Sequence, residues 1–386
     1  MKSKSPIESF KKMQLFFNQR IEKQKENEKE KIKQYFEETT CIHHLIVIDT
    51  FQINNAEHEL TKRIGHYCKD YNVDFMILNY SNKKISFHPV LNGLHIDSIP
   101  VLDTITVLSL HHYSMKISNH KTLLCMWNPV PFILKSINNI LSYDGFLSAH
   151  SPIIDGFLQS ITDCDKQYGY LCTSLPNSLL LPLDDQLPSQ LSIFYIGTNW
   201  EDSGKRKDTV IRKDVKLLLK LLDQKQMTKI YGPKQYHNNE PWKGYKTYQG
   251  PIAFDGKSVI AKIKESGICL VLSTAHHIRS EVCSMRIFEG IAAGVPIICD
   301  MNPFFQKWFG DNLWYIEGET VDDQLQCIDS HIQSIKAHPE DALDKVKKCR
   351  SIFTTYFSFD VQFQKIINTI QNKEVIADLK LLTVVK

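Results

Sequence analysis

The chain has 386 residues, 42% of them hydrophobic and 23% charged, and 46 Lys and Arg nearly balance 43 Asp and Glu. This composition excludes a wholly disordered chain and a fibrous repeat, and the charge gives no reason to expect nucleic acid or an anionic membrane as the main partner. The length predicts two or three domains. Because the sequence has no apolar run of membrane-spanning length and residues 1–20 lack a signal-peptide core, we expect a cytoplasmic protein.

The ten cysteines include no C-x-x-C pair, and several lie in apolar stretches, such as Cys125, Cys269 and Cys299. They are predicted to be small buried side chains in a reducing compartment. The pair His276-His277 has no companion at the spacing of zinc ligands. The sequence therefore predicts no metal site.

Residues 1–38 are expected to form a charged helical extension. Glu and Lys alternate so that many pairs fall four residues apart, which stabilises a solvated helix. Met13, Phe16, Phe17 and Ile21 recur at helical spacing, so a docking helix or a short coiled coil is the alternative to a solvated, frayed helix. The extension is predicted to be too polar to supply core, so that deleting residues 1–36 would leave the rest folded.

Residues 39–185 alternate between short apolar runs and amphipathic stretches. Strands are predicted in HHLIVIDT, VDFMILNY, ITVLSLHHY, KTLLCMWNP and YDGFLSAHS, and helices in AEHELTKRIGHYCKDY and PIIDGFLQSITD. Apolar strands that alternate with helices indicate βαβ units and a parallel sheet. This part is predicted to be an N-terminal Rossmann-like domain.

A proline-bearing segment near residues 170–192 reads as a linker, after which the alternation begins again over residues 186–357. Strands are predicted in SIFYIGTN, MTKIYGP, GICLVLS and VPIICD, and helices in VIRKDVKLLLKLLDQKQ, FDGKSVIAKIKES and CSMRIFEGIAAG. The final stretch, residues 358–386, is predicted to begin with an amphipathic helix. The fold class is thus α/β, with two successive Rossmann-like domains joined by the linker.

The segment SEVCSMRIFEGIAAGVPIICD, residues 280–300, carries the clearest chemical signal. A polar loop follows a buried strand there, and a helix is predicted to begin near Ser284, a suitable N-cap. The amino end of such a helix suits a phosphate or diphosphate, and the carboxyl ends of parallel strands are where open α/β sheets bind ligands. Glu289 lies inside the helix between apolar residues, where ribose hydroxyls would supply the hydrogen bonds that it needs.

This segment resembles the donor-binding motif of GT-B glycosyltransferases, and in particular the Glu-x7-Glu motif of retaining family 4 enzymes and the C-terminal domain of CgeB-type bacterial enzymes. Glu281 and Glu289 have that spacing. The resemblance implies that Glu289 binds the ribose of a sugar nucleotide and that Glu281 lies by the donor sugar at the reacting centre. The amides around Ser284 and Met285, together with Arg286, would hold the diphosphate.

The resemblance extends upstream, where FYIGTNWEDSGKRKD looks like the first strand and glycine loop of a donor domain. It implies that the loop at Gly197 and Thr198 binds the donor and that basic residues nearby neutralise its diphosphate. The basic candidates are Lys205, Arg206, Lys207 and Arg212. Tyr231 and Tyr248 fall where base-binding loops lie in that fold, and Tyr248 is either a base-stacking ring or a turn residue. The final helix looks like the GT-B tail that crosses back to the first domain.

The resemblance implies that the first domain holds the acceptor, faces the second domain across a cleft and supplies further catalytic groups. His111 and His112 end one predicted strand and His150 ends another, so each could face the cleft and bind the donor sugar. The alternative for each is a solvated loop histidine. Trp127 stacks on a sugar ring or packs in the core, and His277 or its neighbour His276 could reach the sugar from the donor loop.

The sequence lacks the motifs of several other enzyme classes. The chain has no complete P-loop, no Gly-x-Ser-x-Gly elbow and no Rossmann Gly-x-Gly-x-x-Gly, and Asp163-Cys164-Asp165 follows a predicted helix rather than a strand. We therefore predict a metal-independent, retaining glycosyltransferase with no cofactor besides a UDP- or GDP-sugar as co-substrate. The expected acceptor is a saccharide, a lipid-linked molecule or a protein, without nucleic acid and with at most peripheral membrane contact. The alternatives are another GT-B enzyme, such as a sugar-nucleotide epimerase, and a non-catalytic GT-B scaffold.

Overall fold

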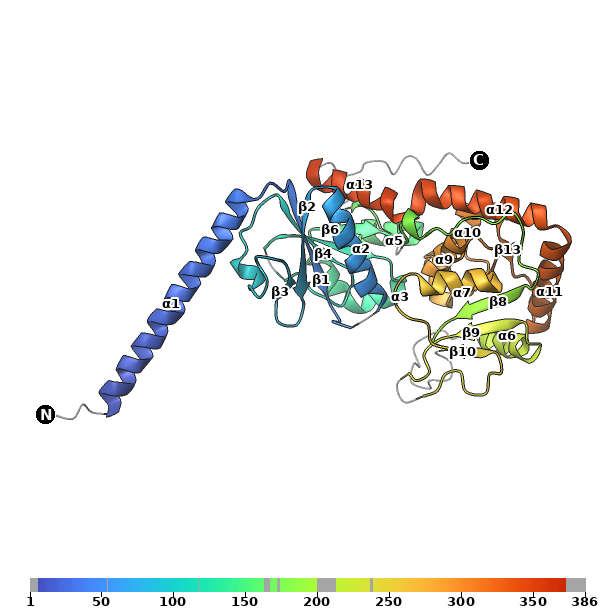
Figure 1. Cartoon of the computed structure of the whole chain (residues 1–386), viewed down its shortest axis with the longest axis horizontal. Helices are drawn as coiled ribbons and strands as arrows, with labels where there is room; N and C mark the ends of the chain where they lie inside the picture. Colours follow the sequence, from blue (N-terminus) through green and yellow to red (C-terminus); the bar gives the residue numbers. More distant parts are fainter. Residues whose placement is uncertain are drawn as a thin grey trace.

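The computed structural model describes residues 6–53, 55–117, 119–162, 167–171, 174–199, 213–236 and 239–372. Within these ranges the chain forms two sheets, one after the other along the sequence, with helices packed on them (Figure 1). The GT-B class predicted from the sequence requires two such α/β units, and the observed arrangement agrees with it.

The first sheet has seven strands in the order β3-β2-β1-β4-β5-β6-β7. They are β1 (His43–Asp49), β2 (Val73–Asn79), β3 (Lys84–Phe87), β4 (Ile105–Ser109), β5 (Lys121–Met126), β6 (Gly145–Ser148) and β7 (Gln167–Tyr170). Every neighbouring pair is parallel except β2 and β3, which are antiparallel. The strands predicted from the sequence pair in parallel as expected, and β3, which the sequence does not predict, is antiparallel because its connection from β2 is too short for a crossover helix.

The second sheet has six strands in the order β10-β9-β8-β11-β12-β13, all parallel. They are β8 (Ser192–Ile196), β9 (Thr228–Tyr231), β10 (Tyr248–Gly250), β11 (Gly267–Val271), β12 (Ile297–Cys299) and β13 (Trp314–Tyr315). Strands β11 and β12 are buried throughout, as expected for strands covered on both faces of a sheet.

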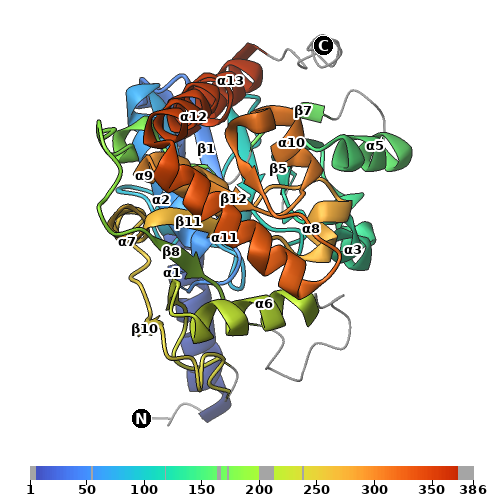
Figure 2. The same ribbon diagram turned by 90° about the vertical axis from the view of Figure 1, so that its right-hand side faces the viewer.

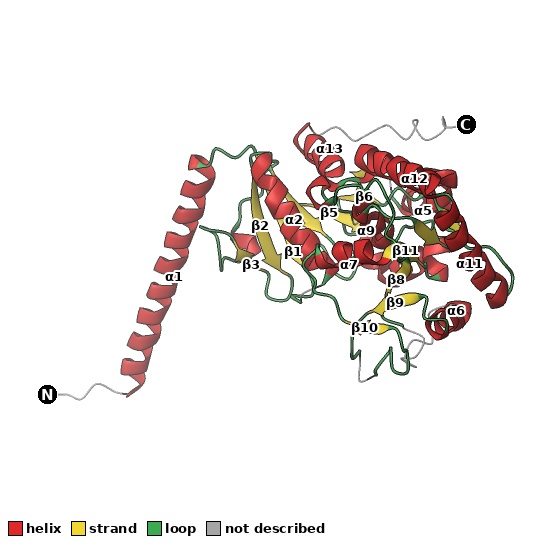
Figure 3. Cartoon of the chain, turned by 45° about the vertical axis from the view of Figure 1, so that its right-hand side comes forward, coloured by secondary structure: helices red, strands yellow, loops and turns green. Residues whose placement is uncertain are grey.

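Helices cover both sheets, and Figure 3 separates them from the strands by colour. The α-helices on the first sheet are α2 (Ala56–Asp70), α3 (Val130–Ile133), α4 (Ile137–Ile140) and α5 (Pro152–Ile161). Those of the second part are α6 (Lys213–Gln224), α7 (Ser258–Ser266), α8 (Ala275–Arg279), α9 (Met285–Ala293), α10 (Pro303–Phe309), α11 (Val321–Ala337), α12 (Pro339–Ile352) and α13 (Phe359–Asn372).

The end of the described chain returns to the first sheet. Figure 2 shows α11, α12 and α13 following one another, and α13 lies against β7 and α2. Oη of Tyr67 on α2 donates a hydrogen bond to Oδ1 of Asp360 on α13, at 2.8 Å. One continuous apolar core joins both parts, from Leu45 on β1 to Phe288 on α9 and Phe357 before α13. The two α/β units are therefore held together by shared core as well as by chain connection.

Helix α1 (Pro6–Glu38) is anchored to the first sheet only near its carboxyl end. Ile32 is buried against the sheet, with 4% of its surface exposed, and Tyr35 and Phe36 pack beside it. The expectation that the extension supplies no core is therefore wrong at these three residues. Sequence reasoning missed them because they follow a long run of Glu and Lys that dominates the composition of the segment.

A partly buried carboxylate, that of Asp74, forms hydrogen bonds at the same contact between α1 and the first sheet. Asp74 on β2 accepts hydrogen bonds from Nδ1 of His44 and from Nε2 of His88, each at 3.1 Å, and a further one from Tyr35 of α1. Burial would raise the pKa of Asp74, but these three hydrogen bonds outweigh it and hold the pKa well below the usual range. The carboxylate is thus charged at neutral pH and links α1 to two strands.

Two truncations are expected to behave differently. In the described part of α1, residues 10–27 are exposed, so deleting residues 1–27 should leave the midpoint of urea unfolding close to that of the full chain. Deleting residues 1–36 also removes the buried Ile32 with Tyr35 and Phe36, and should lower the free energy of unfolding by about 2 kcal/mol or more. Equal midpoints for the two truncations would show that the anchoring contact contributes little.

Candidate active site

Helix α9 begins where the sequence predicts it. Ser284 is the N-cap, and its side-chain oxygen accepts a hydrogen bond from the backbone N–H of Arg286. The helix ends at Gly294, which adopts a left-handed conformation with φ +68°. A Cβ on Gly290 would lie 3.0–3.1 Å from Ile297 and Cys269, so glycine lets the helix approach the sheet closely. The predicted N-cap, helix and glycine end are confirmed, with Met285 as the first helical residue.

Glu289 lies in the middle of α9 with 3% of its surface exposed. Its Oε2 accepts a hydrogen bond from Nη1 of Arg286, one turn earlier in the helix, and no described residue hydrogen-bonds to Oε1. Burial raises the pKa of Glu289, while the positive charges of Arg286 and of Arg63 on α2 act in the opposite direction. A sheltered carboxylate with one oxygen left over can accept hydrogen bonds from ligand hydroxyls.

Glu281 lies between α8 and α9, half-buried, and has a φ of +50°. The sequence predicts a polar loop from the end of the strand to this residue, but residues 275–279 form the short helix α8, capped by Thr274. A left-handed conformation costs roughly 1–2 kcal/mol for a residue with a Cβ and is concentrated at functional sites. The backbone of Glu281 is therefore strained at the position that the motif assigns to the reacting centre.

Ser280, the residue before Glu281, joins the two parts of the molecule. Its Oγ accepts a hydrogen bond from the N–H of Val130, after β5, and its carbonyl accepts one from Oγ of Ser151, after β6. Asn302, after β12, donates to the carbonyl of Val282 and so supports the other side of Glu281. The carboxyl ends of strands from both sheets thus meet at the Glu281 segment, and sequence reasoning named none of these supporting residues.

His111 and His112 follow β4 and are buried rather than solvated. Their rings stack at a centroid distance of 4.4 Å. Nδ1 of His111 accepts a hydrogen bond from the N–H of Tyr113, and Nδ1 of His112 lies 3.2 Å from Nδ2 of Asn128. Nε2 of His112 is buried without a hydrogen-bond partner. A buried nitrogen of this kind can form a hydrogen bond with a ligand hydroxyl.

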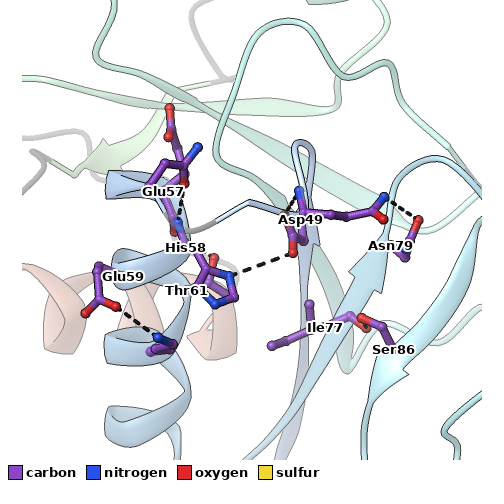
Figure 4. Close-up of polar contacts among 11 residues, drawn as sticks. Asp49, Glu57, His58, Glu59, Thr61, Ile77, Asn79 and Ser86 are labelled. Carbon is purple, nitrogen blue, oxygen red and sulfur yellow. Dashed lines mark hydrogen bonds and ion pairs between the residues drawn. The ribbon is translucent and has the colours of Figure 1, made fainter. Parts of the chain in front are cut away.

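Two further polar atoms near the carboxyl end of β1 lack a partner. They are Oγ1 of Thr50 and Nδ1 of His58. Figure 4 shows His58 of α2 directed toward Asp49 at the end of β1, but the distance from Nδ1 to Oδ2 is 3.8 Å, too long for a hydrogen bond. Together with His112, these groups make the carboxyl edge of β1 and β4 polar and incompletely satisfied.

The side chains of His150 and His277, which the sequence predicts to face the cleft or solvent, both contact other side chains of the protein. The ring of His150 stacks on Tyr170 at 4.2 Å and meets Phe357 edge to face, so it packs among aromatic rings instead of ending a solvated strand. Nδ1 of His277 pairs with Oγ1 of Thr274 at 2.7 Å, within α8. His276 is buried against Phe132 of the first sheet's α3, and its Nδ1 has no partner.

The residues predicted to bind the donor base pack mainly against protein. The ring of Tyr231 is buried and stacks on Phe194 of β8, so it belongs to the core and is not a free base-stacking ring. Oη of Tyr248 donates to the carbonyl of Gly232 at 3.0 Å. The indole N–H of Trp242 donates to the carbonyl of Gly197, which orders the turn after β8.

Thr198 is half-buried in the turn after β8. The basic candidates Lys205, Arg206, Lys207 and Arg212 lie outside the described residues. Trp127 is buried in the apolar core, in line with the core alternative given for it. In the part of the chain that the structure describes, no group of three or more His, Cys, Asp or Glu side chains is placed to hold a metal ion.

The buried histidines should make stability depend on pH. Burial lowers the pKa of His111 to about 3 and the pKa values of His112 and His43 to about 4. Below about pH 6.5 the histidines of the unfolded chain bind protons that the buried rings do not, so unfolding takes up protons. The free energy of unfolding therefore has its full value above about pH 6.5. It falls by up to about 1.4 kcal/mol per pH unit for each histidine as the pH drops toward 4.

Urea unfolding at pH 7.5, 6.5 and 5.5, values that bracket the histidine range, should therefore give a falling free energy of unfolding. Nε2 of His43 lies 3.1 Å from Oγ1 of Thr106, and His43→Gln can keep this hydrogen bond while it removes the titrating ring. The variant should lose less stability on acidification than the parent. Identical pH profiles would contradict the assignment of a neutral buried ring.

Comparisons with known proteins agree with this architecture. Residues 206–368 match the family described as Glycosyl transferase-like. Among solved structures, sucrose-phosphate synthase from Thermosynechococcus elongatus is similar with a TM-score of 0.60 at 12% identity, covering 86% of this chain and 99% of that one. HepE from Anabaena in complex with UDP-glucose has a TM-score of 0.56 at 8% identity, and the match covers 85% of this chain and 99% of HepE. A glycosyltransferase from Rickettsia africae has a TM-score of 0.56 at 14% identity, and the match covers 86% of this chain and 98% of that one.

No curated protein matches the sequence. The structural matches show the fold, and the GT-B class and the resemblance to glycosyltransferases predicted from the sequence are both confirmed. The family match and these neighbours support an enzyme of the GT-B transferase type. None of the described helices is both long and apolar enough to span a bilayer.

Proposed function

We propose that the protein transfers a sugar from a UDP-sugar to a saccharide, lipid-linked or protein acceptor. The observation that carries this proposal is the buried Glu289 on α9, paired with Arg286, in the segment that matches the Glycosyl transferase-like family. UDP is preferred to GDP because similar structures were solved with UDP or UDP-glucose, namely HepE and an alpha-glucosyltransferase.

In this proposal the donor lies over the amino end of α9. The positive end of the helix dipole and the guanidinium of Arg286 would stabilise the charge that develops on the diphosphate as the bond to the sugar breaks. Oε1 of Glu289 would accept hydrogen bonds from the ribose hydroxyls. Glu281, held in a left-handed conformation beside Ser280, would face the sugar.

The acceptor side of the proposal rests on the first sheet. Nε2 of His112 and Oγ1 of Thr50 are buried polar atoms without partners at the carboxyl edge of β4 and β1. Hydroxyl groups of an acceptor or of the donor sugar would satisfy them. Because strand ends of both sheets meet at Ser280, a small rotation of one part against the other would open or close this region to water.

The proposal also includes the stereochemistry of the reaction and its independence of a metal ion. Retention of the anomeric configuration is inferred from the Glu-x7-Glu spacing of Glu281 and Glu289. Metal independence is inferred from the use of a helix terminus and an arginine in place of an Asp-x-Asp motif. Turnover that is unchanged by EDTA would support the second feature, and restoration of activity by added Mg²⁺ or Mn²⁺ would overturn it.

The experiment that tests the function combines binding and turnover. Purified full-length protein is screened by thermal shift against UDP, GDP, ADP and CMP, and a nucleotide that binds the folded state should raise Tm. The corresponding nucleotide-sugar is then tested for release of the free nucleotide without and with simple saccharide acceptors. We expect stabilisation by UDP and UDP release. No shift and no release with any donor would favour the non-catalytic scaffold.

A further inference from the structure

The first part of α1 carries an apolar stripe that nothing in the described chain covers. Phe10, Met13, Phe17 and Ile21 follow one another at intervals of three or four residues, which places them on one face of a helix. Each has 49–59% of its surface exposed. Figure 1 shows this part of α1 extending away from both sheets. An exposed apolar stripe of this kind is typical of a surface that binds a partner or a membrane.

Charge is distributed unevenly along the same segment. Residues 1–21 contain five Lys or Arg against one Glu, whereas residues 22–38 contain five Lys against six Glu. The net charge of +3 for the whole chain therefore conceals a basic segment that coincides with the apolar stripe. Basic groups beside an aromatic and aliphatic face are typical of helices that lie in the interface of an anionic bilayer.

The pattern does not fit pairing with a second copy. A coiled coil needs its apolar seam to continue over three or four heptads. Here the seam ends at Ile21, because the positions that would extend it are Gln24, Lys25 and Glu28. In a parallel pair the basic segments of two copies would also lie side by side and repel each other.

We propose that residues 6–21 of α1 are a membrane-surface anchor that binds anionic lipid. Lys11, Lys12 and Arg20 would contact phosphate or carboxylate groups of the lipid heads, while the apolar stripe enters the boundary between heads and acyl chains. Ile32 buries its side chain against the first sheet at the other end of α1, so the anchor holds the folded body close to the bilayer. This inference does not depend on the proposed function.

The test is sedimentation of the full-length protein with vesicles of phosphatidylcholine alone and of phosphatidylcholine mixed with phosphatidylserine. We expect binding to the mixed vesicles that weakens as salt is added. Two double variants, Phe10→Ser with Phe17→Ser and Lys11→Glu with Lys12→Glu, should each lower the partition coefficient about tenfold or more. The control, Lys23→Glu with Lys25→Glu, makes the same charge change beyond the stripe and should keep most of the binding.

Three results would overturn the proposal. The wild-type protein could fail to bind mixed vesicles, or the stripe and charge variants could bind as tightly as wild type. Light scattering could instead reveal a dimer without lipid that the Phe10 and Phe17 substitutions dissociate, which would assign the stripe to a second copy. Because residues 6–21 lie outside both sheets, unfolding midpoints equal to wild type are expected for every variant and show that lost binding is not lost folding.

Discussion

Replacing Glu289 with glutamine is expected to weaken binding of the donor nucleotide by roughly 10- to 100-fold, since a hydrogen bond to a charged group contributes about 1.5–3 kcal/mol. Sugar transfer should fall at least as far. The carboxylate is buried and paired with Arg286. Glutamine removes the negative charge that would strengthen the hydrogen bonds from the ribose hydroxyls. Calorimetric titration with UDP and a turnover assay measure the two effects.

Glutamine is preferable to alanine here because the side chain is packed. It keeps the volume of Glu289, and its amide oxygen can still accept a hydrogen bond from Arg286. The matched control is Glu265→Gln on α7, which removes a carboxylate from an exposed pair with Lys262. The control should bind and turn over like wild type. Wild-type affinity for UDP in Glu289→Gln, with folding intact, would remove Glu289 from the donor site.

The larger elements of the fold could be predicted from the sequence because each carries a local signal. Buried parallel strands such as β1 and β11 are continuous apolar runs, and α9 has both an N-cap, Ser284, and a glycine end, Gly294. The short strands β3, β10 and β13, of two to four residues, carry too little pattern to be recognised. Their pairing is determined by neighbours that are distant in sequence.

The candidate site could be predicted only in part, for a similar reason. Glu281 and Glu289 are found by their spacing, whereas Ser280 and Asn302 matter because they contact residues more than a dozen positions away. The error at Tyr231 is also one of tertiary packing, since its ring is stacked on Phe194 of the adjacent strand. A tyrosine beside Gly-Pro has the same local sequence whether its ring faces a ligand or the core.

Glu281→Gln is the sharper test of mechanism, and it should lower turnover about 100-fold or more while it changes UDP affinity by less than about threefold. Glutamine keeps the shape of the side chain and the left-handed backbone at φ +50°, so the segment between α8 and α9 should retain its geometry. Only the charge is lost, and in the proposal this charge supports the positive charge that develops at the anomeric carbon. Equal losses of affinity and turnover would instead indicate a role in binding the ground state.

Glu281→Gly separates the charge from the strained backbone. Glycine adopts positive φ without steric cost, so this variant should be as stable as Glu281→Gln or more so, yet equally slow if the carboxylate is what the reaction needs. NMR of the product from the wild-type enzyme should show the anomeric configuration of the donor. An inverted product would end the retaining assignment and direct the search for a general base to the first sheet. His112 would come first there, because its Nε2 is buried without a hydrogen-bond partner in the described chain.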